Sequence, residues 1–157
     1  MARPRTTATA TAQSDPVNTA VLLREAFTVI NSVVPLRLAQ QGHEAIREAH
    51  GVVFQYLDQD GTTVSALAQR AGMTKQAMTE LVAYLEQRDY VRRVPDPHDR
   101  RAKLVLLSAK GQDVLRIALG LVPEMEKRLI DALGRPRWQE LREDLQTIHD
   151  AFADLHQ

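Results

Sequence analysis

The stretch Thr62–Ser108 reads TTVSALAQRAGMTKQAMTELVAYLEQRDYVRRVPDPHDRRAKLVLLS, and its pattern decides the fold. A short apolar stripe of helical spacing follows Thr63, a residue that can cap the N-terminus of a helix. Gly72 interrupts this stripe, and Thr74 is placed to cap a second helix that begins at Lys75. Two helices joined by a short turn that contains glycine form a helix-turn-helix.

The second of these helices has an apolar face and a polar face. Its apolar positions recur every three or four residues, at Ala77, Met78, Leu81, Val82 and Leu85. Its polar face begins with Lys75, Gln76 and Thr79, which carry an ammonium, an amide and a hydroxyl group. These groups can reach phosphates or base edges, and the first turns of a recognition helix enter the DNA major groove. Taken by itself, this helix equally fits an ordinary solvated face.

Two strand-like runs, Tyr90–Val94 and Ala102–Leu107, flank the segment PDPHDRR and predict a β-hairpin with a long loop. Arg100 and Arg101 at the tip of this hairpin suit the concentrated negative potential of a narrow minor groove. The neighbouring Asp99 is predicted to orient an arginine. Further candidate DNA contacts are Thr74 at the start of the recognition helix and, at phosphates, Arg92, Arg93 and Lys103.

The segment DRRAKLVLLSAKG resembles the wing signature of the multiple-antibiotic-resistance regulator (MarR) family. That signature is an acidic residue, one further residue, an arginine and an apolar strand that ends in Leu-Ser. It falls here on Asp99, Arg101, Leu107 and Ser108. TVSALAQRAGMTKQAMTELVAYLEQRDYV resembles the third and fourth helices of the same family. Glu80 departs from the pattern, because many relatives carry a basic or small residue there, so base contacts are not carried over at that position.

The resemblance implies a mainly α (α+β) fold, namely a winged helix-turn-helix with dimerisation helices on both sides. It also implies a homodimeric regulator of transcription that binds double-stranded DNA with sequence specificity, most simply as a repressor. Relatives of this kind bind small aromatic or phenolic anions between the dimerisation helices and the winged helix. Arg47, His50 and Tyr56 lie in the corresponding region, although each can equally have a purely structural role.

Four segments are predicted along the chain. Residues 1–15 are predicted to be a disordered tail, and 16–46 an N-terminal dimerisation helix that Pro35 should kink or interrupt. Residues 47–108 form the winged helix-turn-helix, and 109–157 form the C-terminal dimerisation helices. Ser108 should cap the first C-terminal helix, Pro123 should bend it and Gly134 should end it.

An apolar seam marks the last predicted helix. Its positions step by three and four residues through Trp138, Leu141, Leu145, Ile148, Phe152 and Leu155. The stretch Thr62–Ser108 has fewer than fifty residues and cannot cover both this seam and the apolar face of the first segment. A second copy of the chain is the economical solution. Its two recognition helices would lie about one DNA turn (~34 Å) apart and would favour a pseudo-palindromic site. An intramolecular bundle is the alternative.

Composition excludes several other classes of protein. A chain of 157 residues with 44% hydrophobic content can form one compact domain or a small domain with appended helices. No apolar run approaches the ~20 residues that a membrane span requires, and no secretory segment is evident. The absence of cysteine agrees with a cytoplasmic location. The net charge is zero, yet residues 65–110 contain nine basic and five acidic side chains, so the predicted DNA-binding segment is basic.

No enzyme, metal site or cofactor is predicted. His43 and His50 could share a helix face with Glu44 or Glu48 and suggest zinc, but the chain lacks cysteine and a break is expected between the histidines. Asp96, His98 and Asp99 could form an acid/base set, but they lie on a hairpin tip, which neither removes catalytic groups from water nor holds them in position. The runner-up to a DNA-binding regulator is a helical interaction module that uses the seam from Trp138 to bind a protein partner.

Overall fold

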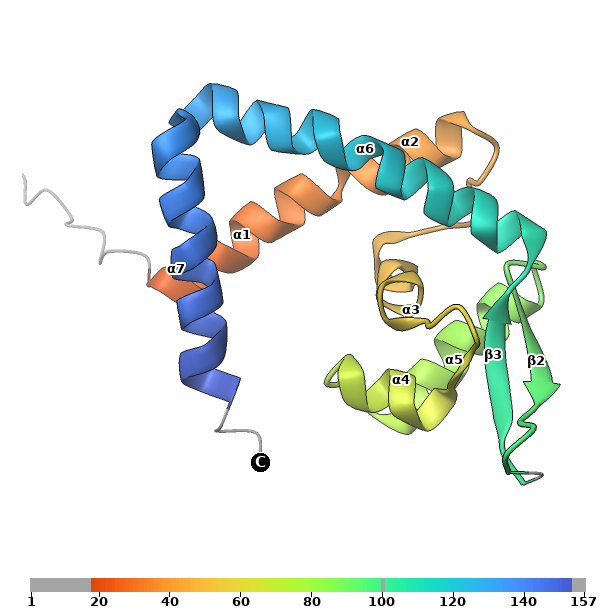
Figure 1. Cartoon of the computed structure of the whole chain (residues 1–157). Helices are drawn as coiled ribbons and strands as arrows, with labels where there is room; N and C mark the ends of the chain where they lie inside the picture. Colours follow the sequence, from red (N-terminus) through yellow and green to blue (C-terminus); the bar gives the residue numbers. More distant parts are fainter. Residues whose placement is uncertain (1–17, 100, 154–157) are drawn as a thin grey trace, which may run out of the picture.

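The computed structural model describes residues 18–99 and 101–153 (Figure 1). The predicted tail at 1–15, Arg100 and Leu155 therefore lie outside the described residues. The winged helix occupies one side of the molecule, α1 and α7 occupy the other, and the long α6 spans the distance between them (Figure 1). This arrangement is the mainly α winged helix-turn-helix with long flanking helices that the sequence predicts.

The winged helix-turn-helix begins after a short 3-10 turn at Glu48–His50, and its elements are listed here in chain order. They are α3 (Gly51–Tyr56), β1 (Thr62–Thr63), α4 (Val64–Arg70), α5 (Lys75–Glu86), β2 (Val91–Pro95) and β3 (Lys103–Leu107). The predicted caps are confirmed, because the side chains of Thr63 and Thr74 accept the backbone N–H groups of Ala66 and Ala77, each at 3.2 Å. Local sequence chemistry therefore sets the start of both helices.

The wing is part of a three-stranded antiparallel sheet in the order β1-β3-β2. Val105 of β3 pairs with Thr62 of β1 on one side and with Arg93 of β2 on the other. The Val105 side chain is fully buried, so this face of the sheet packs on the helices. Gly61, which precedes β1, has a φ of +94° and lies too close to Leu104 and Leu106 for a larger residue.

One core joins the winged helix to its flanking helices. Its largest fully buried side chains come from α3, α4, α5, β3 and the residue before β2, together with one from α2 and one from α6: Val53, Leu67, Met78, Val82, Leu85, Val105, Tyr90, Leu38 and Val114. Leu38 and Val114 belong to the flanking helices. The recognition helix is therefore fixed from behind by the same side chains that attach it to the flanking helices.

The N-terminal arm consists of α1 (Thr19–Asn31) and α2 (Val33–Gln40). The predicted interruption is confirmed but falls at Ser32, three residues before Pro35. Proline has no N–H to donate to the carbonyl one turn earlier, which explains a break on its N-terminal side. Together Thr19–Gln40 is long and apolar enough to cross a membrane by length and composition alone, and none of its most apolar window is buried. The expectation that no apolar run approaches that length is therefore wrong.

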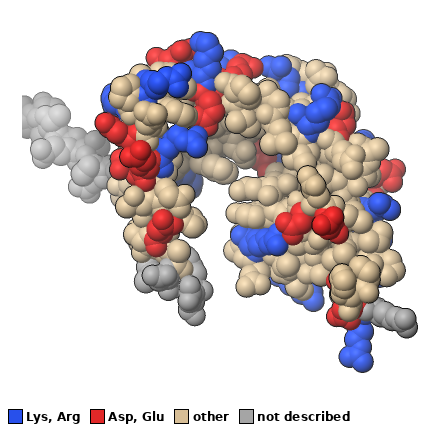
Figure 2. Space-filling view, viewed as in Figure 1, with Lys and Arg blue, Asp and Glu red and all other residues tan. Residues whose placement is uncertain are grey.

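The C-terminal arm consists of α6 (Ala109–Leu133) and α7 (Arg135–Ala153). Ser108 caps α6 by accepting the Gly111 N–H at 3.1 Å, as predicted. The helix continues through Pro123 without interruption and ends at Gly134, whose φ is +79°. On α7 the seam side chains stay exposed or half-exposed, and none of its described residues is buried. In the space-filling view, open space separates the α7 arm from the winged helix (Figure 2).

Candidate nucleic-acid interface

The exposed face of α5 carries the side chains that the sequence predicts for the major groove. Lys75, Gln76 and Thr79 are all exposed, whereas Met78 on the opposite side of the helix is fully buried. The Thr79 hydroxyl donates to the Lys75 carbonyl at 2.6 Å, and Gln76 Nε2 donates to Glu80 Oε1 at 3.4 Å. The face therefore presents an ammonium, an amide and a hydroxyl from a helix held in place by the core behind it.

The tip of the wing is shaped by aspartate side chains that accept backbone N–H groups. Asp99 Oδ1 accepts the backbone N–H of Arg101 at 2.9 Å, and Asp96 Oδ1 accepts that of His98 at 2.8 Å. The sequence predicts that Asp99 orients an arginine, and the contact that the structure provides is to the backbone of Arg101. This contact fixes the turn from which the exposed Arg101 side chain projects.

The three basic strand residues differ in their surroundings. Arg92 and Lys103 are exposed, as a phosphate contact requires. Arg93 is half-buried, and its Nε lies 3.5 Å from Oε2 of Glu86, the last residue of α5. Arg92 and Lys103 are therefore accessible to a nucleic-acid backbone, whereas Arg93 contacts the recognition helix.

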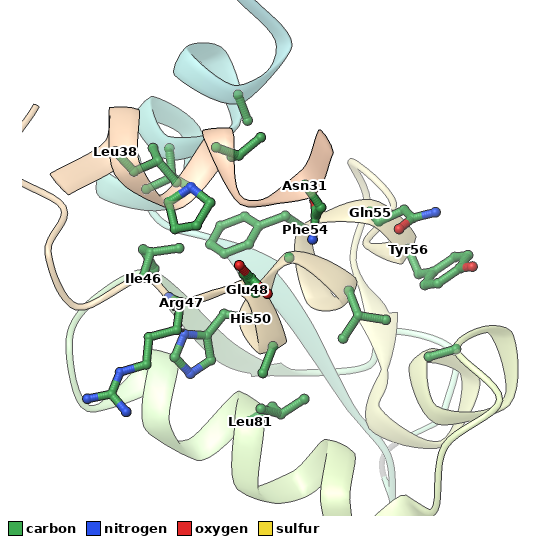
Figure 3. A pocket seen from close by; sticks show the side chains of 18 of the residues that line it. Asn31, Leu38, Ile46, Arg47, Glu48, His50, Phe54, Gln55, Tyr56 and Leu81 are labelled. Carbon is green, nitrogen blue, oxygen red and sulfur yellow. Dashed lines mark hydrogen bonds between the residues drawn. The ribbon is translucent and has the colours of Figure 1, made fainter. Parts of the chain in front are cut away.

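Behind α5 lies a cavity of about 960 Å³, bounded by α1, α2, α3, α5 and α6 (Figure 3). All three residues that the resemblance suggests for a ligand pocket, Arg47, His50 and Tyr56, line it. Phe54 and Leu81 add to its largely apolar wall, and the Arg47 side chain extends outward past His50 (Figure 3). The cavity thus combines an apolar interior with a few polar groups, a composition that suits small organic molecules.

His50 is the buried polar group of this cavity. Its Nδ1 accepts the backbone N–H of Arg47 at 3.0 Å, and its ring stacks on Tyr84 with centroids 4.5 Å apart. The Arg88 guanidinium also lies over the Tyr84 ring, 3.6 Å from its centroid. Burial lowers the pKa of His50, and the positive charges of Arg47 and Arg88 lower that pKa further. The imidazole is therefore neutral at pH 7 and, with Nδ1 accepting, carries its proton on Nε2.

A buried histidine outside the cavity has partners that sequence reasoning missed. His43 lies between Asp113 of α6 and the hydroxyl of Tyr90, next to β2, and does not pair with His50. The residues it contacts are far away in the sequence, so no local signal indicates the pairing. In residues 18–99 and 101–153, no group of three or more His, Cys, Asp or Glu side chains is placed to hold a metal ion.

The exposed helix face, the projecting wing and the shared core define a winged helix-turn-helix DNA-binding protein. A model of the MarR family matches residues 47–102. The transcriptional regulator HosA of Escherichia coli O111:H- is 28% identical over 116 residues, which span 72% of this chain and 86% of HosA. The chain is therefore similar to transcriptional regulators of the MarR family, and its fold and exposed helix face are those of a DNA-binding transcriptional regulator.

Solved structures share the fold over most of its length. The S. aureus MepR–DNA complex has a TM-score of 0.70 at 20% identity and covers 86% of this chain and 98% of its own. The transcriptional regulator PA4135 has a TM-score of 0.68 at 26% identity and covers 85% of this chain and 97% of its own. The similarity therefore includes the flanking helices as well as the winged helix.

Proposed function

We propose that this regulator is a homodimeric, cytoplasmic repressor that binds a pseudo-palindromic operator and releases it in response to a small aromatic or phenolic molecule. The main support for the proposal is that α5 exposes polar side chains on one face while its other face is buried in the core, and that the wing projects beside it. Lys75, Gln76 and Thr79, with Thr74 at the helix start, read the major groove, and Arg101 enters the minor groove. Arg92 and Lys103 contact phosphates.

The dimer is supported by apolar side chains that the protomer leaves uncovered at both ends of the chain. Phe27 of α1 is 64% exposed, Leu36 of α2 is 66% exposed and Phe152 of α7 is 59% exposed. Leu145 and Ile148 continue the same face of α7. Side chains of this size on an open arm need a covering surface, and a second copy supplies an identical one.

The response to a small molecule is supported by the cavity behind α5. The cavity touches both the flanking helices and the recognition helix, so an occupant can stabilise one arrangement of the two over the other. Its apolar wall suits an aromatic ring. The Arg47 side chain at its edge suits a carboxylate or phenolate.

Selection of binding sites from a random duplex library tests the DNA readout directly. We expect enrichment of a pseudo-palindrome whose half-sites lie about one helical turn (~34 Å) apart. Affinity for the same duplexes should fall steeply as the salt concentration rises. Each neutralised phosphate contributes about −0.9 to the slope of log binding constant against log salt concentration. A library that shows no enrichment, and no binding even at low ionic strength, would exclude the proposed function.

Light scattering after size-exclusion chromatography tests the dimer. We expect a mass of twice 17.6 kDa for the native chain. Phe152→Asp, which places a charge on the apolar face of α7, should shift the mass toward that of one chain. Thr147→Asp adds the same charge to the same helix away from that face and should leave the dimer intact. A native chain that elutes as a monomer at micromolar concentration overturns the dimer.

A thermal-shift screen of small aromatic acids tests the response to a ligand. A molecule that binds the folded state raises the melting temperature by mass action. We expect the molecules that do so to release the selected duplex as well. Stabilising molecules that leave DNA affinity unchanged contradict the proposed regulation without affecting the proposed DNA readout.

A further inference from the structure

Two consecutive arginines of β2 lie on opposite faces of the wing. Arg92 pairs with Leu106, and Arg93 pairs with the fully buried Val105. Directly opposed residues of an antiparallel pair share a face of the sheet. The Arg93 side chain therefore lies on the face that packs against the helices, and the exposed Arg92 lies on the other face.

Most of the Arg93 guanidinium is withdrawn from solvent. Its Nε and Nη2 atoms are buried and have no hydrogen-bond partner among the described residues. The nearest opposite charge is the carboxylate of Glu86, with Nε and Oε2 separated by 3.5 Å. A buried charge without a counter-charge is costly, so the Glu86 carboxylate compensates Arg93 electrostatically. Atoms that are buried in this way cannot reach a phosphate while the wing keeps its position.

The ion pair joins two elements that must contact one duplex together. Glu86 ends α5, and Arg93 is the third residue of β2, whose strand leads to the wing tip. The intervening turn is closed by the Tyr90 N–H, which donates to the Leu85 carbonyl at 2.9 Å. The wing is thus attached to the recognition helix at this turn and again at the ion pair further along the strand. Two attachments fix the angle between the wing and α5, whereas the turn alone would leave this angle free to vary.

We infer that Arg93 is a positioning residue for DNA binding, whose ion pair with Glu86 holds the wing at the angle to α5 that lets both reach the duplex. The sequence alone suggests a phosphate contact for Arg93, a role that its exposed neighbour Arg92 fits better. The inference rests on the proposed DNA interface, because it concerns the joint use of Gln76 on α5 and Arg101 on the wing.

Glu86→Gln distinguishes the two roles of Arg93 by the sign of its effect. Affinity is measured by fluorescence anisotropy with the duplex recovered by selection, on the full-length dimer. If Arg93 is a positioning residue, Glu86→Gln weakens binding by roughly two- to fivefold, the range expected for a partly exposed ion pair. If Arg93 contacts a phosphate, removal of the nearby negative charge tightens binding instead, and that result overturns the inference.

A charge exchange gives the second measurement. Arg93→Glu alone should weaken binding, and Glu86→Arg combined with Arg93→Glu should restore much of the loss, because the ion pair re-forms with reversed polarity. At a phosphate contact the new glutamate repels DNA whatever occupies position 86, so failure of the double variant to recover overturns the inference. Arg92→Glu is the matched control, and Glu86→Arg should not rescue it. Thermal melting of each variant separates loss of folding from loss of positioning.

The third measurement asks whether the contribution of Arg101 to DNA affinity depends on the ion pair between Glu86 and Arg93. In the native background Arg101→Ala should reduce the affinity for DNA. In the Glu86→Gln background the same substitution should reduce affinity by a smaller factor, because a wing that is no longer held at its angle contacts the duplex less through its tip. Equal factors in both backgrounds overturn the positioning role. An Arg101→Ala variant with native affinity in the native background instead contradicts the proposed wing contact itself, so the two failures are distinguishable.

Discussion

His43 Nε2 lies 2.9 Å from Oδ2 of Asp113, across 70 residues of chain. The other ring nitrogen of His43 is 3.4 Å from the Tyr90 hydroxyl. His43 follows α2, Tyr90 precedes β2 and Asp113 lies in the first turns of α6. One buried imidazole therefore joins the N-terminal arm, the base of the wing and the C-terminal arm.

Removal of the His43 ring should destabilise this junction. His43→Ala leaves the Tyr90 hydroxyl without its buried partner, and an unsatisfied buried polar group costs about 1–3 kcal/mol. Glu44→Ala, at the exposed neighbouring position, should change the free energy of unfolding by less than about 0.5 kcal/mol. Urea unfolding at one fixed protein concentration measures both. Equal losses for the two variants would show that the junction contributes no stability.

Gly111 should not tolerate alanine. A Cβ at this position would lie 2.0 Å from the Tyr90 carbonyl oxygen, so α6 would have to move away from the base of the wing. Overpacking of this kind costs about 1–3 kcal/mol or more. Gly120→Ala in the same helix meets no atom within 4 Å, so helix propensity should stabilise it by up to about 1 kcal/mol. Thermal melting compares the two variants, and a neutral Gly111→Ala would contradict the close approach.

Gln76→Ala should relax sequence preference at one base pair of each half-site. A bidentate amide contact discriminates against the wrong base by about 1–3 kcal/mol, and alanine removes that discrimination. Competition binding with single-base variants of the selected duplex measures the change. A uniform loss over all positions would place Gln76 at the backbone rather than at a base.

Arg101→Ala should instead weaken binding to many sequences. The Asp99 contact uses the backbone N–H of residue 101, so the turn survives the substitution and only the guanidinium is lost. Asp99→Ala is the companion variant, because it removes the acceptor that shapes the turn. Binding assays at low salt should show reduced affinity for both. Unchanged affinity of Arg101→Ala shows that the wing does not enter the groove as proposed.

Stability should fall as the pH drops below neutrality, in part through His50. Burial and two nearby arginines hold the pKa of His50 in the folded state below its ordinary value of 6.5. The unfolded chain therefore takes up this proton at a higher pH than the folded chain, and the free energy of unfolding decreases as pH falls through that interval. The pKa values of Asp58 and Asp113 are lowered by hydrogen bonds, first to Arg70 and Arg116 respectively. The contribution of these two carboxylates to the free energy of unfolding is lost only under more acidic conditions, as the pH falls below 3.8, their ordinary pKa.

The substitution His50→Phe tests this pH dependence. Phenylalanine keeps a ring beside Tyr84 but cannot take up a proton. Urea unfolding between pH 7.5 and pH 5.5 should show a flatter dependence in the variant than in the native chain. Identical slopes would assign the dependence to other groups.

Much of the fold is predictable because its signals are local. Thr63, Thr74 and Ser108 are each followed by an apolar helical pattern, and each caps the helix that the sequence predicts. The exposed face of α5 follows from helical periodicity in the same way. Tertiary relationships are not available from such patterns. Gly111 looks merely tolerated in sequence, whereas the approach of the Tyr90 carbonyl requires it.

The surroundings of the basic residues show the same limit. Alternation along β2 predicts that Arg92 and Arg93 lie on opposite faces but not which face meets the helices, so both resemble phosphate contacts in sequence. The pairing of Arg93 with Val105 decides the question. The interruption of the N-terminal arm, by contrast, is predictable from Pro35, and it falls at Ser32 because the proline has no N–H to donate to the carbonyl one turn earlier.

Opposite sides of α5 serve the cavity and the DNA face. Ala77, Leu81 and Tyr84 line the cavity, and Gln76 and Thr79 are exposed to solvent. Thermodynamic linkage makes the effect reciprocal. If a molecule in the cavity lowers the affinity of the protein for its operator by some factor, binding of the operator lowers the affinity for that molecule by the same factor. The concentration at which such a regulator responds consequently depends on how much DNA is present, so sensitivity measured with free protein overstates sensitivity on the chromosome.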